Sequence, residues 1–292
     1  MNKATIKLSN DETIHYIESG IDNQEVLILI HGNMSSSYHY LPIFDLLSRN
    51  YHTIALDLRG FGDSTYHTPI ESLEDYADDI KLFMEALTIK NAHLAGWSTG
   101  GGIALKFAAK YPDLIGKLIL IESASIKGYP IYEKDTSYQP ILTKLYQSKE
   151  AMAKDPVQVV PALNALKTND LEFMKQIWLA AIYNQHVPED IDFYIKETLK
   201  QRNLIDIDWA LMTFNMSHEH NGVVDGDGSI DNVVAKTLVI YGLKDLVIPR
   251  YMFDETVEAL NNKTVEIYED GSHSPITDFP IELAKRIIKF LK

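Results

Sequence analysis

One serine stands at the sharpest break in the pattern of the chain. The stretch HLAGWSTGGGIALKF, residues 93–107, begins as an apolar strand, turns through several glycines around Ser98 and resumes as a helix. A P-loop would need a lysine after the glycines, and a dinucleotide-binding turn would need another glycine spacing. A Gly-x-Ser-x-Gly turn between a strand and a helix instead holds its serine in a strained bend. We therefore predict that Ser98 is a nucleophile rather than part of an ordinary turn.

A nucleophilic serine needs a base and an acid that orients the base. His273, in YEDGSHSPITDFP, follows the last predicted strand, where a side chain reaches the carboxyl edge of a sheet. Asp245, in LVIYGLKDLVIP, follows the preceding strand and is expected at the same edge. Glu122, in LILIES, also follows a strand end and is the alternative acid. We prefer Asp245 because nucleophile, acid and base then follow one another along the chain in the order expected for a sheet of parallel strands connected by helices.

The attacked carbonyl becomes an oxyanion, which needs preorganised hydrogen-bond donors, each contributing on the order of 10²-fold or more in rate. In LILIHGNMSSS, His31 and Gly32 end a strand and let the backbone N–H of Asn33 face the site. The N–H of Thr99, directly after the nucleophile, is the expected second donor. Trp97, His31 and Gly32 are expected to contact the substrate.

The elements that must position these residues are visible as short apolar runs. Runs rich in β-branched residues predict strands buried on both faces at residues 26–30, 53–56, 92–95, 117–121, 237–241 and 265–268. A helical pattern occupies residues 73–87 between two of them. This alternation predicts a mostly parallel sheet with helices on both faces. Residues 4–8 and 13–17 are expected to form an antiparallel hairpin of edge strands.

Residues 125–232 break the alternation. This segment is helix-like, rich in aromatic residues and interrupted by prolines, which predicts a helical cap inserted between sheet strands. The expected organisation is a core formed by residues 1–124 and 233–292 with a cap of residues 125–232 between its two parts. Aromatic residues expected to form mainly the cap core, and partly an apolar acyl pocket, are Tyr129, Tyr132, Trp178, Phe193, Trp209 and Phe214.

Several separate stretches resemble the α/β-hydrolase superfamily. They are HGN at 31–33, DLRGFGDS at 57–64, GWSTGG at 96–101, and the loops that carry Asp245 and His273. The resemblance covers residues 1–122 and 235–292, and GWSTGGG also resembles the nucleophile turn of intracellular polyhydroxybutyrate depolymerases. It implies a mostly parallel eight-stranded sheet flanked by helices, with a helical cap inserted between the sixth and seventh strands.

The resemblance also implies roles for the named residues. Ser98 would be the nucleophile, His273 the base and then the acid, and Asp245 the orienting carboxylate. Asn33 and Thr99 would be the oxyanion donors. The turn of Asp57, Arg59 and Gly60 would be structural. A serine at position 98 argues against the haloalkane dehalogenase and epoxide hydrolase branches, whose nucleophile is a carboxylate, and no metal or organic cofactor is required.

Composition limits the possible partners. The 292 residues are 46% hydrophobic and 23% charged, which allows a large buried core. A formal net charge of −14 opposes binding to nucleic acid or to anionic membrane surfaces. The absence of cysteine excludes disulfides and thiolate nucleophiles. The beginning of the chain shows no signal peptide, and the longest aliphatic run, 26–30, is too short to span a membrane, so we expect a cytoplasmic protein.

Together these features predict a serine hydrolase that cleaves carboxylic esters of small, largely uncharged substrates through an acyl-enzyme. A lactonase, thioesterase, amidase, intracellular polyester depolymerase or perhydrolase would use the same three residues. A ligand-binding or receptor protein with a hydrolase fold is an alternative of another class. The sequence leaves the oligomeric state open.

Overall fold

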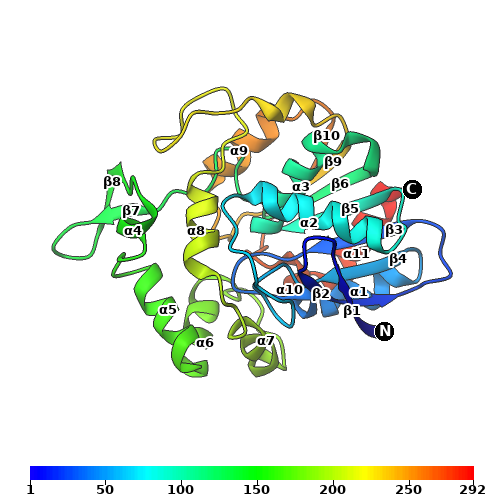
Figure 1. The fold of residues 1–292 in the computed structure, drawn as a ribbon, viewed down its shortest axis with the longest axis horizontal. Helices are drawn as coiled ribbons and strands as arrows, with labels where there is room; N and C mark the ends of the chain where they lie inside the picture. Colours follow the sequence, from blue (N-terminus) through cyan, green and yellow to red (C-terminus); the bar gives the residue numbers. More distant parts are fainter.

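A central eight-stranded sheet organises the computed structural model, which describes all 292 residues. The strand order is β1-β2-β4-β3-β5-β6-β9-β10 (Figure 1). The strands are β1 (Asn2–Lys7), β2 (Thr13–Ser19), β3 (Val26–Ile30), β4 (His52–Leu56), β5 (Ala92–Trp97), β6 (Ile115–Ile121), β9 (Lys236–Gly242) and β10 (Lys263–Tyr268). β2 pairs antiparallel with β1 and β4, and all other neighbours are parallel. The predicted parallel sheet is thereby confirmed, and so is the hairpin, although only β1 lies at the edge.

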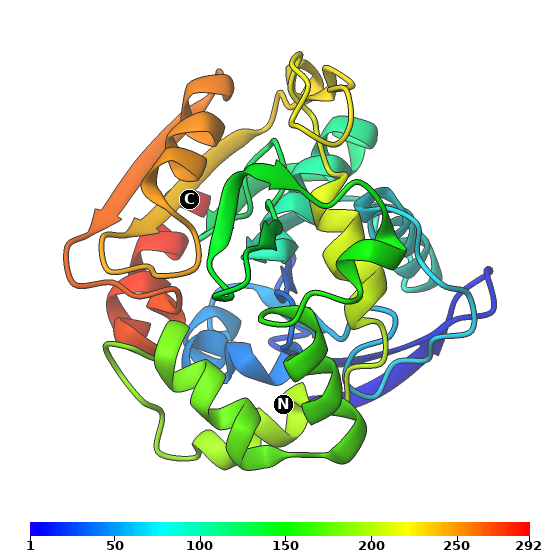
Figure 2. The same cartoon turned by 90° about the vertical axis from the view of Figure 1, so that its left-hand side faces the viewer.

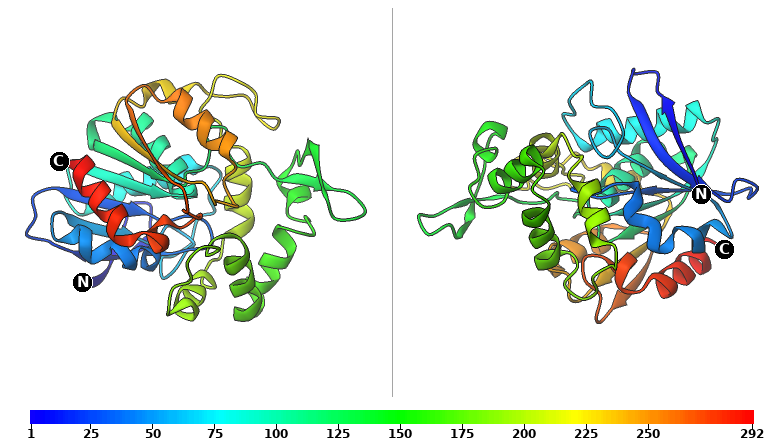
Figure 3. Two further views of the ribbon diagram at one scale, coloured as in Figure 1. Left: turned by 180° about the vertical axis from the view of Figure 1, so that it is seen from behind. Right: turned by 90° about the horizontal axis from the view of Figure 1, so that it is seen from below.

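Helices cover both faces of this sheet (Figures 1 and 3). One core packs against α2 (Leu73–Ala86), α3 (Thr99–Lys110) and α9 (Arg250–Ala259). The core on the other face contains α1 (Leu41–Ser48), α10 (Pro275–Asp278) and α11 (Pro280–Leu291). The central strands are apolar on both sides because both of their faces are buried in this way. Two single turns of 3-10 helix, η1 (Ser37–Tyr40) and η2 (Pro112–Leu114), complete the core.

The cap, residues 125–232, lies between β6 and β9 in the chain and at one end of the sheet, facing the viewer in Figure 2. Its elements are β7 (Tyr132–Lys134), β8 (Pro140–Leu145), α4 (Lys149–Met152), α5 (Val159–Thr168), α6 (Leu171–Ala181), α7 (Ile191–Thr198), α8 (Leu204–Met212) and the 3-10 turn η3 (Ser229–Asn232). Most elements of the cap are helices, and the β7–β8 hairpin is an addition that the prediction of a helical cap did not include. These strands are short and none of their residues is buried, so they lack the apolar alternation that identifies a strand.

No helix combines the length and the hydropathy that crossing a membrane requires.

Candidate active site

Ser98 occupies a strained bend between β5 and α3. Its φ of 55° and ψ of −123° lie where residues other than glycine are uncommon, at a cost of about 1–3 kcal/mol. The bend is possible because glycines surround it: a Cβ added to Gly100 would lie 2.1 Å from the carbonyl oxygen of Ile30. The N–H of Ser98 donates to the carbonyl of Ile121 (2.9 Å), which attaches the bend to β6. The Ser98 side chain does not cap the helix, and the residue is partly exposed.

His273 and Asp245 form a buried pair at the same edge of the sheet. Nδ1 of His273 donates to Oδ2 of Asp245 (2.8 Å), and both side chains are almost completely buried. Oδ1 of Asp245 accepts from the N–H groups of Val247 (2.6 Å) and Ile248 (3.0 Å). Burial opposes ionisation, but the neighbouring His273 and these hydrogen bonds lower the pKa of Asp245 below its ordinary value. The pairing leaves Nε2 of His273 as the basic nitrogen.

Trp97 connects this pair to the nucleophile turn. Its Nε1 donates to the carbonyl oxygen of His273 (2.7 Å), and the two rings lie 5.9 Å apart. The residue directly before Ser98 therefore holds the His273 loop. No hydrogen bond joins the Ser98 hydroxyl to His273 in this structure. Such bonds are often long in a free enzyme and tighten when substrate binds.

Two of the three residues expected to contact substrate make other contacts in this structure. Trp97 is only 2% exposed and is committed to the His273 loop. His31 is fully buried: its Nδ1 donates to the carbonyl of Gly32 (2.8 Å) and its Nε2 accepts from the N–H of Leu58 (3.0 Å). Both rings are buried and their nitrogens bond to backbone groups, and their contact with substrate stays a prediction. Gly32 lies directly against Ser98, because a Cβ added there would lie 2.8 Å from Cβ of Ser98.

Two backbone N–H groups near Ser98 are unused within the protein. Thr99 is the first residue of α3, so its N–H has no partner in the helix, and the N–H of Asn33 makes no backbone hydrogen bond either. The positive end of the helix dipole adds to the attraction for a negative charge at Thr99. These are the two predicted oxyanion donors.

The cap holds the Asn33 loop in place. Nδ2 of Asn33 donates to Oδ1 of Asp208 on α8 (2.9 Å), and its Oδ1 accepts from Nε2 of Gln201 (2.8 Å). Oε1 of Gln201 accepts from the N–H of Met34 (3.0 Å), and the Thr198 hydroxyl donates to the carbonyl of Met34 (2.6 Å). Met34 has a φ of 52°, so these contacts hold a strained residue.

Sequence reasoning missed Thr198, Gln201 and Asp208. They lie 164 or more residues from their partners, in the cap, where no motif marks them. Thr198 ends α7, Gln201 lies between α7 and α8, and Asp208 lies within α8, so no local pattern links the three. Burial raises the pKa of Asp208 to about 7, although the hydrogen bond from Asn33 acts in the opposite direction.

The alternative acid, Glu122, does not hydrogen-bond to His273. Its Oε1 instead accepts from the N–H of Gly242 (2.5 Å). The acid that hydrogen-bonds to the His273 imidazole in this structure is therefore Asp245.

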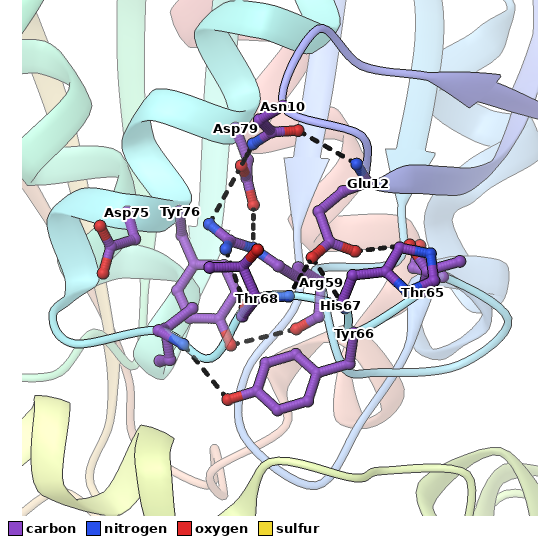
Figure 4. Close-up of polar contacts among 12 residues, drawn as sticks. Asn10, Glu12, Arg59, Thr65, Tyr66, His67, Thr68, Asp75, Tyr76 and Asp79 are labelled. Carbon is purple, nitrogen blue, oxygen red and sulfur yellow. Dashed lines mark hydrogen bonds and ion pairs between the residues drawn. The ribbon is translucent and has the colours of Figure 1, made fainter.

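The DLRGFGDS segment makes a network of polar contacts with the β1–β2 turn and α2 (Figure 4). Nε and Nη2 of Arg59 donate to the two carboxylate oxygens of Asp79 (2.8 and 3.2 Å), and Asn10 donates to the same carboxylate (2.7 Å). Asp57 is fully buried and accepts from the N–H of Ser37 (2.7 Å). These contacts belong to a structural turn, as the sequence suggested.

Of the six cap aromatics expected in the cap core or the pocket, Tyr129, Tyr132 and Trp209 are partly buried. Trp178 and Phe214 are buried in the two main cores, whereas Phe193 is 37% exposed.

Residues 25–280 match the family model described as alpha/beta hydrolase fold, and the chain belongs to this family. It is 24% identical over 278 residues to the monoacylglycerol lipase ABHD6 of Bos taurus, covering 91% of this chain and 74% of that protein. Among solved structures, a putative lipase from Acinetobacter baumannii has a TM-score of 0.75 at 24% identity, covering 99% of this chain and 90% of that one. An esterase from Exiguobacterium antarcticum has a TM-score of 0.74 at 19% identity, covering 99% of both chains. The protein is therefore a hydrolase-fold protein with esterases and lipases among its structural neighbours.

Proposed function

We propose that this protein is a serine hydrolase that cleaves carboxylic esters through an acyl-enzyme on Ser98. The observation that carries the proposal is the buried His273–Asp245 hydrogen bond of 2.8 Å at the sheet edge where Ser98 occupies its strained bend. The unused N–H groups of Asn33 and Thr99 support it.

In the proposed reaction, Nε2 of His273 removes the proton from the Ser98 hydroxyl as Oγ attacks the ester carbon. The carbonyl π electrons move to oxygen, and the N–H groups of Asn33 and Thr99 stabilise that oxyanion. The imidazolium then gives its proton to the leaving alkoxide, which departs as an alcohol. Water, deprotonated by His273, attacks the acyl-enzyme in the second half, and the proton returns to Oγ of Ser98 as the acid leaves. Asp245 remains ionised and stabilises the imidazolium throughout.

The charges of the protein favour substrates without a carboxylate. The net charge is −14, and the carboxyl of Asp208 lies against the side chain of Asn33, next to a proposed oxyanion donor. Above neutral pH Asp208 becomes ionised and repels an anionic substrate. We therefore place small, largely uncharged esters first among the substrates.

The test combines labelling and turnover. The protein is incubated with a fluorophosphonate probe and with p-nitrophenyl esters of increasing acyl length, beside Ser98→Ala. Ser123→Ala is a matched control, because Ser123 is a neighbouring buried serine whose hydroxyl donates to the carbonyl of Ala124 (2.9 Å). We expect Ser98→Ala to lose both labelling and turnover while Ser123→Ala keeps both. An intact protein that neither labels nor hydrolyses any ester would refute the proposal and favour a ligand-binding role.

A further inference from the structure

Glu122 is a buried acid that the proposed reaction does not use. It directly follows β6, has a φ of 43° and is 1% exposed. Its N–H donates to the carbonyl of Ile240 in the neighbouring β9 (3.1 Å), which fixes the backbone beside the Asp245 loop. A charged carboxylate is costly in such a place unless several donors surround it.

The two oxygens of Glu122 have very different surroundings. Oε1 accepts from the N–H of Gly242 (2.5 Å), whereas Oε2 is buried and has no donor. The Gly242 residue that donates to Oε1 also accepts, through its carbonyl, from the N–H of Asp245 (3.1 Å), so Glu122 lies beside the Asp245 loop, and each of the two carboxyls acts on the pKa of the other. Two ionised carboxylates repel each other at this range, so a hydrogen bond between them needs one shared proton.

The proton belongs on Glu122 because Asp245 has more donors. Asp245 accepts from two backbone N–H groups and from His273, whereas Glu122 accepts from Gly242 alone. Burial, followed by the charge of Asp245 and the hydrogen bond to it, raises the pKa of Glu122 well above its ordinary value. The other titratable groups that act on this pair are Asp278, Tyr241 and Tyr129, and none of them brings a positive charge to Glu122.

We propose that Glu122 is a positioning residue: as a neutral carboxylic acid it donates a hydrogen bond from Oε2 to Asp245 and holds this carboxylate in line with Nδ1 of His273. The inference rests on the proposed triad, since it explains how the orienting acid is itself oriented. In this arrangement Glu122, after β6, is neutral and donates the hydrogen bond, whereas Asp245, after β9, is ionised and accepts it.

Two substitutions at one position test the hydrogen bond. In Glu122→Gln the amide donates to Asp245 from Nε2 and accepts from Gly242 through Oε1, so both contacts survive without a charge. In Glu122→Leu both are lost at similar volume. We expect Glu122→Leu to lower kcat/KM about tenfold to a hundredfold, mainly through kcat, and Glu122→Gln to restore it to within about threefold of the parent. A Leu variant as fast as the parent, or a Gln variant as slow as the Leu variant, would overturn the proposal.

The pH profile tests the protonation state separately. If Glu122 is neutral, the acid limb of kcat/KM lies at the same pH in the parent and in Glu122→Gln. If it were ionised, Gln would remove a negative charge beside the Asp245–His273 pair and move the limb down by about one pH unit or more. Asp278, Tyr241 and Tyr129 are unchanged in both proteins, so their effects cancel. A downward shift of that size refutes the neutral acid.

An infrared measurement on the resting protein needs no activity. The parent at pH 8 should show the C=O stretch of a protonated carboxylic acid that moves in D₂O and is missing from the spectrum of Glu122→Gln. The measurement compares only the parent with Glu122→Gln, which keeps the contact with the N–H of Gly242. It therefore does not depend on whether Glu122→Leu folds. If the parent hydrolyses no ester but the band is present, the proposed function fails and the shared proton stands. If turnover occurs and the difference spectrum lacks the band, the proposed function stands and the neutral Glu122 is refuted.

Discussion

Replacing Asp208 with Asn tests how much a carboxyl beside Asn33, a proposed oxyanion donor, costs the folded protein in stability. Asp208 is partly buried on α8 and contacts Asn33 through Oδ1 (2.9 Å), an acceptor that the Asn variant retains. Burial raises its pKa from 3.8 to about 7. Between these pH values the unfolded chain releases the proton and the folded protein keeps it. The contribution of Asp208 to stability therefore falls as pH rises from about 4 to 7 and is constant above that range.

The size of the effect follows from the shift. About three pKa units correspond to about 4 kcal/mol of destabilisation at pH 8, of which about 2.5 kcal/mol develops between pH 5 and pH 8. Asp208 is partly exposed, so solvent screening reduces this figure. We expect the free energy of unfolding of Asp208→Asn, relative to the parent, to increase by about 1–2.5 kcal/mol between pH 5 and pH 8.

Urea denaturation at pH 5, 6.5 and 8, with linear extrapolation to water, measures this difference. Asp22→Asn is the control, because Asp22 is exposed in the loop before β3 and its substitution should leave the difference flat with pH. A constant difference between Asp208→Asn and the parent at pH 5 and pH 8 would show that the folded protein does not hold this proton, and the reasoning from burial would be refuted.

Three substitutions test the positions around Ser98, the proposed nucleophile. Gly32→Ala places a Cβ 2.8 Å from Cβ of Ser98, so we expect a displaced nucleophile and about a 10²-fold fall in kcat/KM with p-nitrophenyl esters; parent-like kinetics would show that the loop moves aside freely. Gln201→Leu removes the contacts with Asn33 and Met34, and should lower kcat about tenfold with KM changed less, whereas a change confined to KM would contradict a role in the oxyanion loop. Asp245→Asn should lower kcat by up to about 10⁴-fold, far more than Glu122→Gln does, and the opposite ranking would transfer the orienting role to Glu122.

The local sequence pattern was sufficient to predict most strands of the central sheet and the bend at Ser98. The parallel strands follow from short apolar runs, because a strand covered on both faces needs apolar residues on both. The bend at Ser98 follows from its glycines, since only a residue without a Cβ fits where position 100 meets the carbonyl of Ile30. The placement of Ser98, Asp245 and His273 at one edge of the sheet was also predictable, because each follows a strand and the carboxyl ends of parallel strands lie on one edge.

Other features depend on the path of the chain in space. Both Glu122 and Asp245 follow a strand, and only the packing of the loops after β9 and β10 brings Asp245 to His273. Trp97 and His31 were expected to contact substrate, and only the structure shows that their ring nitrogens bond to backbone of other loops and that the rings are buried. Gln201 reaches the Asn33 loop from 168 residues away. A run of a few residues carries the hydrophobic period and the turn chemistry of its own segment, but it carries no information about which distant donor will lie within 3 Å of a given acceptor.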